Sequence, residues 1–327
     1  MNKMINNLYG KTILVTGATG LIGKTLIKGL LSCEGINVIA FVRDEKKAEQ
    51  IFDASEHLEI VAGDIRNYDF NSIKSRIDYI VHAASETSSK SFVKSPVDVI
   101  NTAISGTLNV LEFARTCNPA KVVFLSSMEV YGAPKTDEKI YETACNNIDT
   151  METRSSYPES KRMCESMCRS YYSQYGVNTV VLRLTQTFGE GVDYNDTRVF
   201  AEFARCVIEN KDIVLKTKGE TMRSYLHVDD AVNAIVCALC DGKPGEAYNV
   251  ANEETYCSIY DMACIVIKEY GNGASVKIEE TDTSGSGYAK TLHMNLDTTK
   301  IRSLGWKPRY GLLDMYKDMI EYMTTSI

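Results

Sequence analysis

The chain has few of the residues that metal sites need. Its 327 residues include only four histidines, and no paired Cys-x-x-Cys modules with matching histidines occur. Of the ten cysteines, Cys237 and Cys240 form the one Cys-x-x-Cys, inside an apolar run that is typical of a buried helix. Core thiols are therefore favoured there over a metal or redox role. We predict no metal site, and so many unpatterned cysteines indicate a reducing compartment.

Long apolar runs and an excess of positive charge are also lacking. No run is long enough to span a membrane, and residues 1–10 are polar, without the apolar core of a signal peptide. The net charge of -7 argues against a nucleic-acid surface and against an anionic membrane. We therefore expect a cytoplasmic protein with no nucleic-acid or membrane partner.

The chain does have a regular alternation of short apolar runs and helical patterns. The apolar runs span residues 11–16, 37–42, 58–62, 79–84, 121–126 and 179–184. Strands that are apolar throughout suit a parallel sheet covered on both faces, which predicts an α/β, Rossmann-like doubly wound fold. After residue 184 the alternation loosens. We assign 1–184 with about 226–250 to a dinucleotide-binding domain, and 185–225 with 251–327 to a smaller C-terminal substrate-binding lobe.

A glycine triplet follows the first predicted strand. Gly17, Gly20 and Gly23 stand between that strand and a helix, spaced Gly-x-x-Gly-x-x-Gly rather than Gly-x-Gly-x-x-Gly. The first glycine permits a tight turn, the second lets the backbone approach a pyrophosphate, and the third lets helix pack on strand. The helix N-terminus attracts the anion. The predicted cofactor-binding residues of this loop are Gly17, Thr19, Gly20, Leu21, Ile22 and Gly23.

The ends of the second and third strands bear on the choice of cofactor. Arg43 favours a 2'-phosphate and hence NADP, whereas the neighbouring Asp44 keeps NAD open. Asp64 and Ile65 close the third strand, where an aspartate can reach the adenine amino group. A simple turn explains Asp64 almost equally well.

Two short stretches carry acid–base chemistry. Tyr157 and Lys161 are four residues apart and so lie on one face of a helix. An ammonium beside a phenol favours the phenolate, so we expect Lys161 to lower the pKa of Tyr157 and make it an acid–base group. Ser127 follows a sheet strand, at the edge where ligands bind in open α/β sheets, and its hydroxyl can bond a substrate oxygen.

With these residues in place, the chain resembles the extended short-chain dehydrogenase/reductase family, in its nucleotide-sugar epimerase/dehydratase branch. The resemblance covers nearly the whole chain. It rests on Thr16–Gly23, Gly63–Ile65, Val81–Ala84, Phe124–Gly132, Tyr157-x-x-x-Lys161, Leu182–Leu184, Arg223–Asp230 and Leu304–Pro308.

The resemblance implies a bound nicotinamide dinucleotide (NAD or NADP) and a nucleoside-diphosphate sugar substrate. By position, Ser127 and Tyr157 match the family's catalytic residues, and Lys161 the lysine that binds the ribose. A sugar carbon, usually C4, would be oxidised to a ketone, and hydride would return after rotation, elimination or epimerisation. Ala83, Ala84 and Ser85 would line the cofactor and Thr87 the substrate. The helices at 107–115 and 157–171 would form the usual homodimer face.

The chain departs from the family pattern at a few positions. Met128 stands where the 4,6-dehydratases of this branch carry an acidic residue, and a thioether cannot donate a proton, so dehydration is disfavoured. Glu129 is retained and can act as a base, although a structural role is equally compatible. Gln186 replaces an asparagine that faces the substrate diphosphate, and Arg223 is the expected phosphate clamp. An arginine common in the late loop is missing, with Lys290 as a possible substitute.

Three functions remain open from the sequence. The leading one is an NAD(P)-dependent nucleotide-sugar epimerase. A dehydratase, decarboxylase or 4-ketoreductase of the same family is the second. A dinucleotide-binding sensor without catalysis is the third, and the presence of Ser127, Tyr157 and Lys161 together argues against it.

Overall fold

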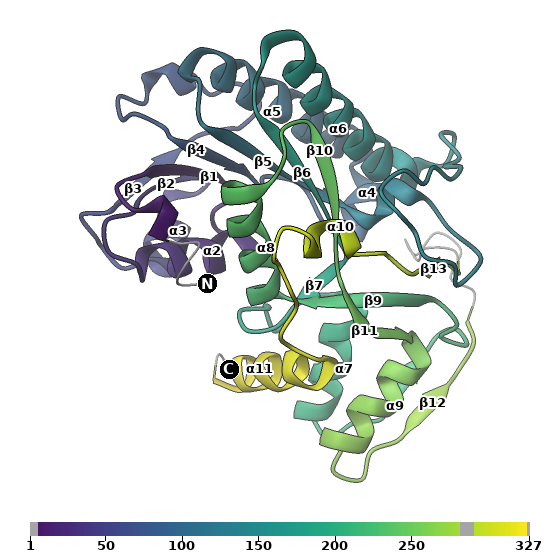
Figure 1. The fold of residues 1–327 in the computed structure, drawn as a ribbon. Coiled ribbons are helices and arrows are strands. Elements are labelled where there is room, and N and C mark those ends of the chain that lie inside the picture. The colour runs from purple at the N-terminus through teal and green to yellow at the C-terminus, as the bar shows by residue number, and fades with distance from the viewer. Residues whose placement is uncertain (1–5, 282–290, 326–327) are drawn as a thin grey trace.

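A computed structural model describes residues 6–281 and 291–325. Its centre is a seven-stranded sheet in which every neighbouring pair is parallel (Figure 1). The strand order is β10-β6-β5-β4-β1-β2-β3. The strands are β1 (Thr12–Thr16), β2 (Asn37–Val42), β3 (Leu58–Ala62), β4 (Tyr79–His82), β5 (Lys121–Ser127), β6 (Thr179–Leu184) and β10 (Glu246–Val250). The predicted Rossmann-like doubly wound sheet is therefore confirmed.

Helices cover both faces of this sheet, as the apolar strands predict. The long helices α5 (Pro96–Cys117) and α6 (Ser156–Tyr175) pack side by side on one face, and α2 (Leu21–Leu31) and α8 (Val228–Asp241) pack together on the other (Figure 1). Shorter helical elements lie before, between and after the strands. They are α3 (Glu45–Ile51), α4 (Ser89–Lys94), α10 (Thr299–Arg302) and the 3-10 turns η1 (Asn6–Leu8), η2 (Phe70–Ser72), η3 (Met128–Tyr131) and η4 (Thr153–Ser155).

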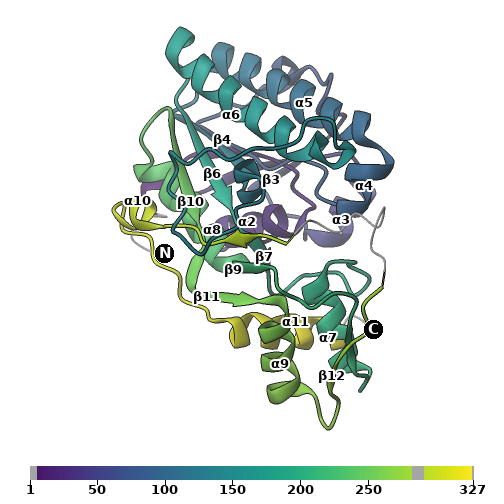
Figure 2. The ribbon, with the colours of Figure 1, turned by 90° about the vertical axis from the view of Figure 1, so that its right-hand side faces the viewer.

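A smaller lobe lies beside the carboxyl ends of the sheet strands (Figure 2). Its sheet joins β7 (Gln186–Phe188), β9 (Met222–His227), β11 (Asn252–Ser258) and β13 (His293–Met294), and a separate pair joins β8 (Ile213–Leu215) to β12 (Val276–Ile278). Its helices are α7 (Val199–Ile208), α9 (Ile259–Tyr270) and α11 (Leu312–Thr325). The lobe has an apolar core of its own, built around Phe188, Phe200 and Met319. The division of the chain at 1–184 with 226–250 stays a proposal, which this separate core supports.

The structure differs from the sequence prediction mainly in the lengths of elements. The helix expected at 107–115 begins at Pro96, because proline is well tolerated in the first turn of a helix. Strand β9 falls where the sequence showed only a family motif. Most of the Ser/Gly-rich late loop, residues 281–287 of the sequence, and Lys290 lie outside the described residues. Over the described part of the chain, no helix is both long and apolar enough to cross a membrane.

Candidate active site

A cleft of about 1520 Å³ runs along the carboxyl ends of the sheet strands and continues against the smaller lobe. It brings together nearly all of the residues that the sequence predicts for cofactor, substrate and catalysis. Those in its wall are Gly17, Thr19, Gly20, Leu21, Ile22, Gly23, Arg43, Ile65, Ala83, Ala84, Ser85, Thr87, Ser127, Glu129, Tyr157, Lys161, Gln186 and Arg223. Asp64 is the predicted residue that does not line it.

The glycine loop leaves a space that a backbone-binding anion fits. Gly17 has a φ of +70°, and a Cβ built on it would lie 2.7 Å from the carbonyl carbon of Ala83 and from the backbone nitrogen of Ala84. Helix α2 begins directly after Gly20, which provides no side-chain cap for the first N–H groups. Those N–H groups, at the positive end of the helix dipole, suit a pyrophosphate. The cradle therefore fits the dinucleotide that the sequence predicts.

Two basic side chains that follow β2 face the cleft, one directly after the strand and one in α3. Arg43 and Lys47 both line the cleft. Asp44 does not, because its carboxylate caps α3 and accepts a hydrogen bond of 3.1 Å from the Lys47 backbone N–H. Asp64 is held by the Arg66 guanidinium at 2.9 Å, and this hydrogen bonding lowers the pKa of Asp64 to about 2. The expected contact of Asp64 with adenine thus has a competing partner inside the protein.

Tyr157, Lys161 and Ser127 converge at one wall of the cleft. The Lys161 ammonium donates a 2.7 Å hydrogen bond to the Leu125 carbonyl and lies 5.9 Å from the centroid of the Tyr157 ring. Burial lowers the pKa of Lys161 to about 8. Burial also raises the pKa of Tyr157, and the Glu129 carboxylate adds to the increase, while the neighbouring Ser127 hydroxyl opposes it.

The expectation that Lys161 brings the pKa of Tyr157 down is therefore wrong. The phenol is buried, and removing a phenolate from water costs more than its neighbours return, so the pKa of Tyr157 is raised. A raised pKa favours the neutral phenol, which suits a proton donor. Acting as a base requires a further positive charge beside it.

Two side chains beside Tyr157 were not predicted from the sequence. Arg154, in η4, forms a two-point ion pair with Glu129, with N–O distances of 2.9 and 3.0 Å. The Phe92 ring, from α4, stacks on Tyr157 with centroids 4.2 Å apart and planes 9° apart. Arg154 stands three residues before Tyr157 in the sequence, which is the one signal that marked its position.

The part of the cleft nearer the lobe carries amide and guanidinium groups. Arg223, in β9, donates a 3.1 Å hydrogen bond to the side-chain oxygen of Gln186, in β7, so the two predicted diphosphate ligands are adjacent. Arg198 also lines the cleft and was not predicted; it pairs with Asp196, whose Oδ1 lies 3.0 Å from the Arg198 Nε.

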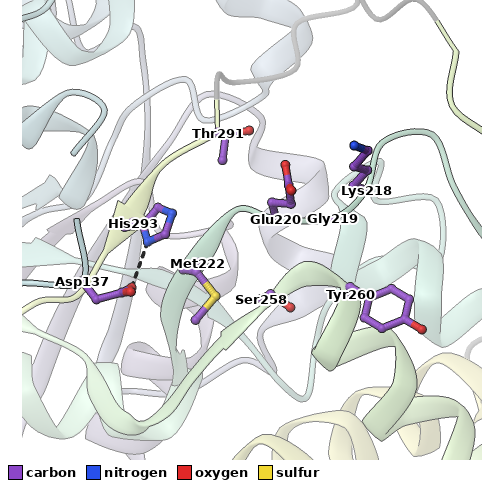
Figure 3. Close-up of a pocket in the computed structure, with 9 residues that line it drawn as sticks. All are labelled: Asp137, Lys218, Gly219, Glu220, Met222, Ser258, Tyr260, Thr291 and His293. Atoms are coloured by element: carbon purple, nitrogen blue, oxygen red, sulfur yellow. Dashed lines mark hydrogen bonds and ion pairs between the residues drawn. The ribbon is translucent and has the colours of Figure 1, made fainter. Parts of the chain in front are cut away.

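A second, smaller pocket of about 560 Å³ adjoins this end of the cleft (Figure 3). Lys218, Gly219, Glu220 and Thr291 line both spaces. Among its lining residues, the Nδ1 atom of His293 lies within hydrogen-bond distance, 2.8 Å, of the Asp137 carboxylate. None of the predicted catalytic residues lines this pocket. Among residues 6–281 and 291–325, no group of three or more His, Cys, Asp or Glu side chains is placed to hold a metal ion.

Comparison with known proteins shows which family this chain resembles. Residues 13–251 match the model of the NAD dependent epimerase/dehydratase family. Curated relatives include UDP-glucuronic acid decarboxylase 1 of Xenopus tropicalis, 27% identical over 99% of this chain and 75% of that protein. UDP-glucuronic acid decarboxylase 5 of Arabidopsis thaliana is 26% identical over 92% of this chain and 85% of that protein.

Solved structures share the fold. A UDP-N-acetylglucosamine 4-epimerase from Methanobrevibacter ruminantium M1 superposes with a TM-score of 0.85 at 22% identity, covering 98% of this chain and 100% of that chain. A UDP-glucuronic acid 4-epimerase from Bacillus cereus, solved with NAD, gives 0.81 at 22% identity, covering 96% and 99%.

Proposed function

Because the chain belongs to the NAD dependent epimerase/dehydratase family, we propose that it is a nucleotide-sugar 4-epimerase that works through a transient keto sugar. One observation carries the proposal: Ser127, Tyr157 and Lys161 meet at the wall of a cleft that also contains the glycine cradle. Epimerisation needs no acid for water loss, and Met128 cannot supply one.

The residues divide the work by their positions. The cradle binds the pyrophosphate of the cofactor, and Lys161 holds its ribose. When bound, the oxidised nicotinamide supplies a hydride acceptor and a positive charge near Tyr157. Tyr157 takes the proton of the sugar hydroxyl as that carbon is oxidised, and Ser127 shares a hydrogen bond with the same oxygen. Return of the hydride to the other face of the ketone would give the epimer, and Tyr157 would return the proton to the sugar oxygen.

The test is incubation of the purified protein with NAD and a panel of nucleoside-diphosphate sugars, with products identified by NMR. We expect an epimer of one substrate. Turnover should fall at least about 100-fold in Tyr157→Phe, because phenylalanine lacks the hydroxyl group that moves the proton in general acid–base catalysis. Full activity of Tyr157→Phe would refute the mechanism.

Decarboxylation of a nucleoside-diphosphate uronic acid is the second candidate. Its support is Glu129 in the cleft and the presence of UDP-glucuronic acid decarboxylases among the relatives. A keto group at C4 would activate the C5 carboxylate for loss as carbon dioxide. The panel separates the two candidates, because UDP-glucuronic acid would give a pentose product in one case and a uronic-acid epimer in the other.

For the cofactor, the family supports NAD, and Arg43 with Lys47 in the wall supports acceptance of a 2'-phosphate as well. We propose that both dinucleotides bind and that Arg43→Ala weakens NADP more than NAD. Titration by isothermal calorimetry measures both affinities, and equal weakening of the two would contradict this role of Arg43.

We further propose a homodimer in the cytoplasm, with Gln186, Arg223 and Thr87 binding the substrate. The dimer rests on exposed apolar side chains of α5 and α6, including Val97 at 65% exposure, Leu108 at 45% and Met163 at 54%. Such a face on two adjacent helices suits burial against a second copy.

A further inference from the structure

We propose that Arg154 is a positioning residue that shields Tyr157 from the charge of Glu129, by holding that carboxylate in a two-point ion pair. The inference rests on the proposed role of Tyr157 as the acid–base group. It assigns Arg154, which no sequence motif singled out, and it gives Glu129 a role in tuning its neighbour in addition to any role as a base.

The geometry forms a continuous column beside the reacting phenol. The Arg154 guanidinium lies 5.7 Å from the centroid of the Phe92 ring, and Phe92 stacks on Tyr157. The Ser156 hydroxyl donates a 3.1 Å hydrogen bond to the Phe92 carbonyl, which fixes α4 against the start of α6. Arg154 therefore lies over the same ring that covers Tyr157.

The ion pair is only partly solvated. The side chains of Glu129 and Arg154 are each 23% exposed, and both line the cleft. The forked contact matches the planar guanidinium to the carboxylate, which a lysine could not do. At this depth a charge is screened less than at the surface, so an unpaired Glu129 would act strongly on groups nearby.

The charges that face Tyr157 come from every element around it. Glu129, from η3, disfavours the phenolate, whereas Arg154, from η4, and Arg198, from the segment before α7, favour it. Lys161 lies on the same helix as Tyr157, and the Ser127 hydroxyl approaches from the end of β5. Glu129 and Arg154 thus act on the phenol with opposite signs, and Arg154 offsets part of the effect of Glu129.

This opposition gives the experiment its sign. Arg154→Gln leaves Glu129 unpaired and should raise the pKa of Tyr157, whereas Glu129→Gln leaves Arg154 unpaired and should lower it. The double variant should fall between the two. Each single shift should be of the order of one pH unit, the size expected for a unit charge at this range and partial burial.

The readout is the pH dependence of the first half-reaction, followed by the absorbance of the reduced nicotinamide in rapid mixing of the NAD-loaded protein with its substrate. This step needs Tyr157 but no later base. We expect the midpoint of its rising limb to move to higher pH in Arg154→Gln and to lower pH in Glu129→Gln. Lys211→Gln, which breaks the distant pair between Lys211 and Glu209, should leave it unchanged.

Midpoints that stay in place, or that move in the same direction in both single variants, would overturn the inference. A purely structural ion pair would give that result, with lower rates but no opposed shift. If Arg154→Gln does not fold, Glu129→Gln and Arg154→Lys still test the inference. Because lysine keeps the positive charge, Arg154→Lys should shift the midpoint less than half as far as the shift expected for Arg154→Gln. If Tyr157→Phe stays fully active, the proposed function fails instead, so the two failures can be told apart.

Discussion

Replacing Lys161 with methionine should make the ligand-free protein more stable while removing its activity. Lys161 is buried, and its ammonium donates a 2.7 Å hydrogen bond to the Leu125 carbonyl. The same ammonium lies 4.8 Å from the centroid of the Phe124 ring. Methionine has a similar length and no charge, so it can occupy the same space against that ring.

The size of the effect follows from the pKa of Lys161, which burial lowers from 10.5 to about 8. That difference corresponds to about 3 kcal/mol of cost for burying the charge at neutral pH. Losing the hydrogen bond to Leu125 costs about 1 kcal/mol. We therefore expect a gain of about 2 kcal/mol in the free energy of unfolding at pH 7.

The gain should also depend on pH in a defined direction. Below about pH 8 Lys161 is protonated in both the folded and the unfolded protein, and the full cost applies. Between about 8 and 10.5 the unfolded state binds more protons, so the wild type gains stability as the pH rises. The advantage of Lys161→Met should therefore shrink across this window and vanish above it.

Urea unfolding of both proteins, without ligands, at pH 7 and at pH 9.5 measures this difference. Lys121→Met is a matched control, because Lys121 is also buried, at the first position of β5. Its ammonium donates a 3.1 Å hydrogen bond to the Ala238 carbonyl, and it does not line the cleft. The Lys121→Met protein should keep its activity. A Lys161→Met protein that is less stable than the wild type at pH 7, or an advantage that does not change with pH, would refute the reasoning.

Two further predictions concern the cradle and the outer helices. Gly17→Ala places a methyl group against the backbone of Ala83 and Ala84 and requires alanine to adopt a positive φ. It should cost about 1–3 kcal/mol of stability and weaken NAD binding at least about tenfold, as measured by calorimetry. Unchanged affinity would show that the loop does not bind the dinucleotide. Leu108→Glu with Met163→Glu should give a folded monomer by light scattering, and a persistent dimer would place the interface elsewhere.

The parts of the site that the sequence predicted are those encoded by local pattern. The glycine loop, Ser127 and Tyr157 each follow directly from a strand or helix that their neighbours define, and parallel strands necessarily bring their carboxyl ends to one edge. Once the strands were placed, the convergence of these residues in one cleft followed from topology alone.

The parts that the sequence missed depend on contacts between distant segments. Phe92 meets Tyr157 only because α4 packs against η4 and the start of α6. Glu129 meets Arg154 because η3 and η4 both pack against α6. The predicted direction of the Tyr157 pKa shift was wrong for the same reason. The spacing shows that Lys161 is near, but it does not show how deeply the phenol is buried. The carboxylate of Asp64 accepts a hydrogen bond from Arg66, two residues later in the chain, and this contact was not predicted either.

The position of β10 at the border of the main sheet has a consequence for synthesis on the ribosome. Strand β6 ends at Leu184, but its outer partner, β10, begins only at Glu246, after β7, α7, β8, β9 and α8 have been translated. Until then the nascent chain carries a bare strand edge containing Val180 and Leu182, two residues that are fully buried in the finished protein. Such an edge invites pairing with other chains, so fragments that stop near residue 184 should aggregate rather than fold.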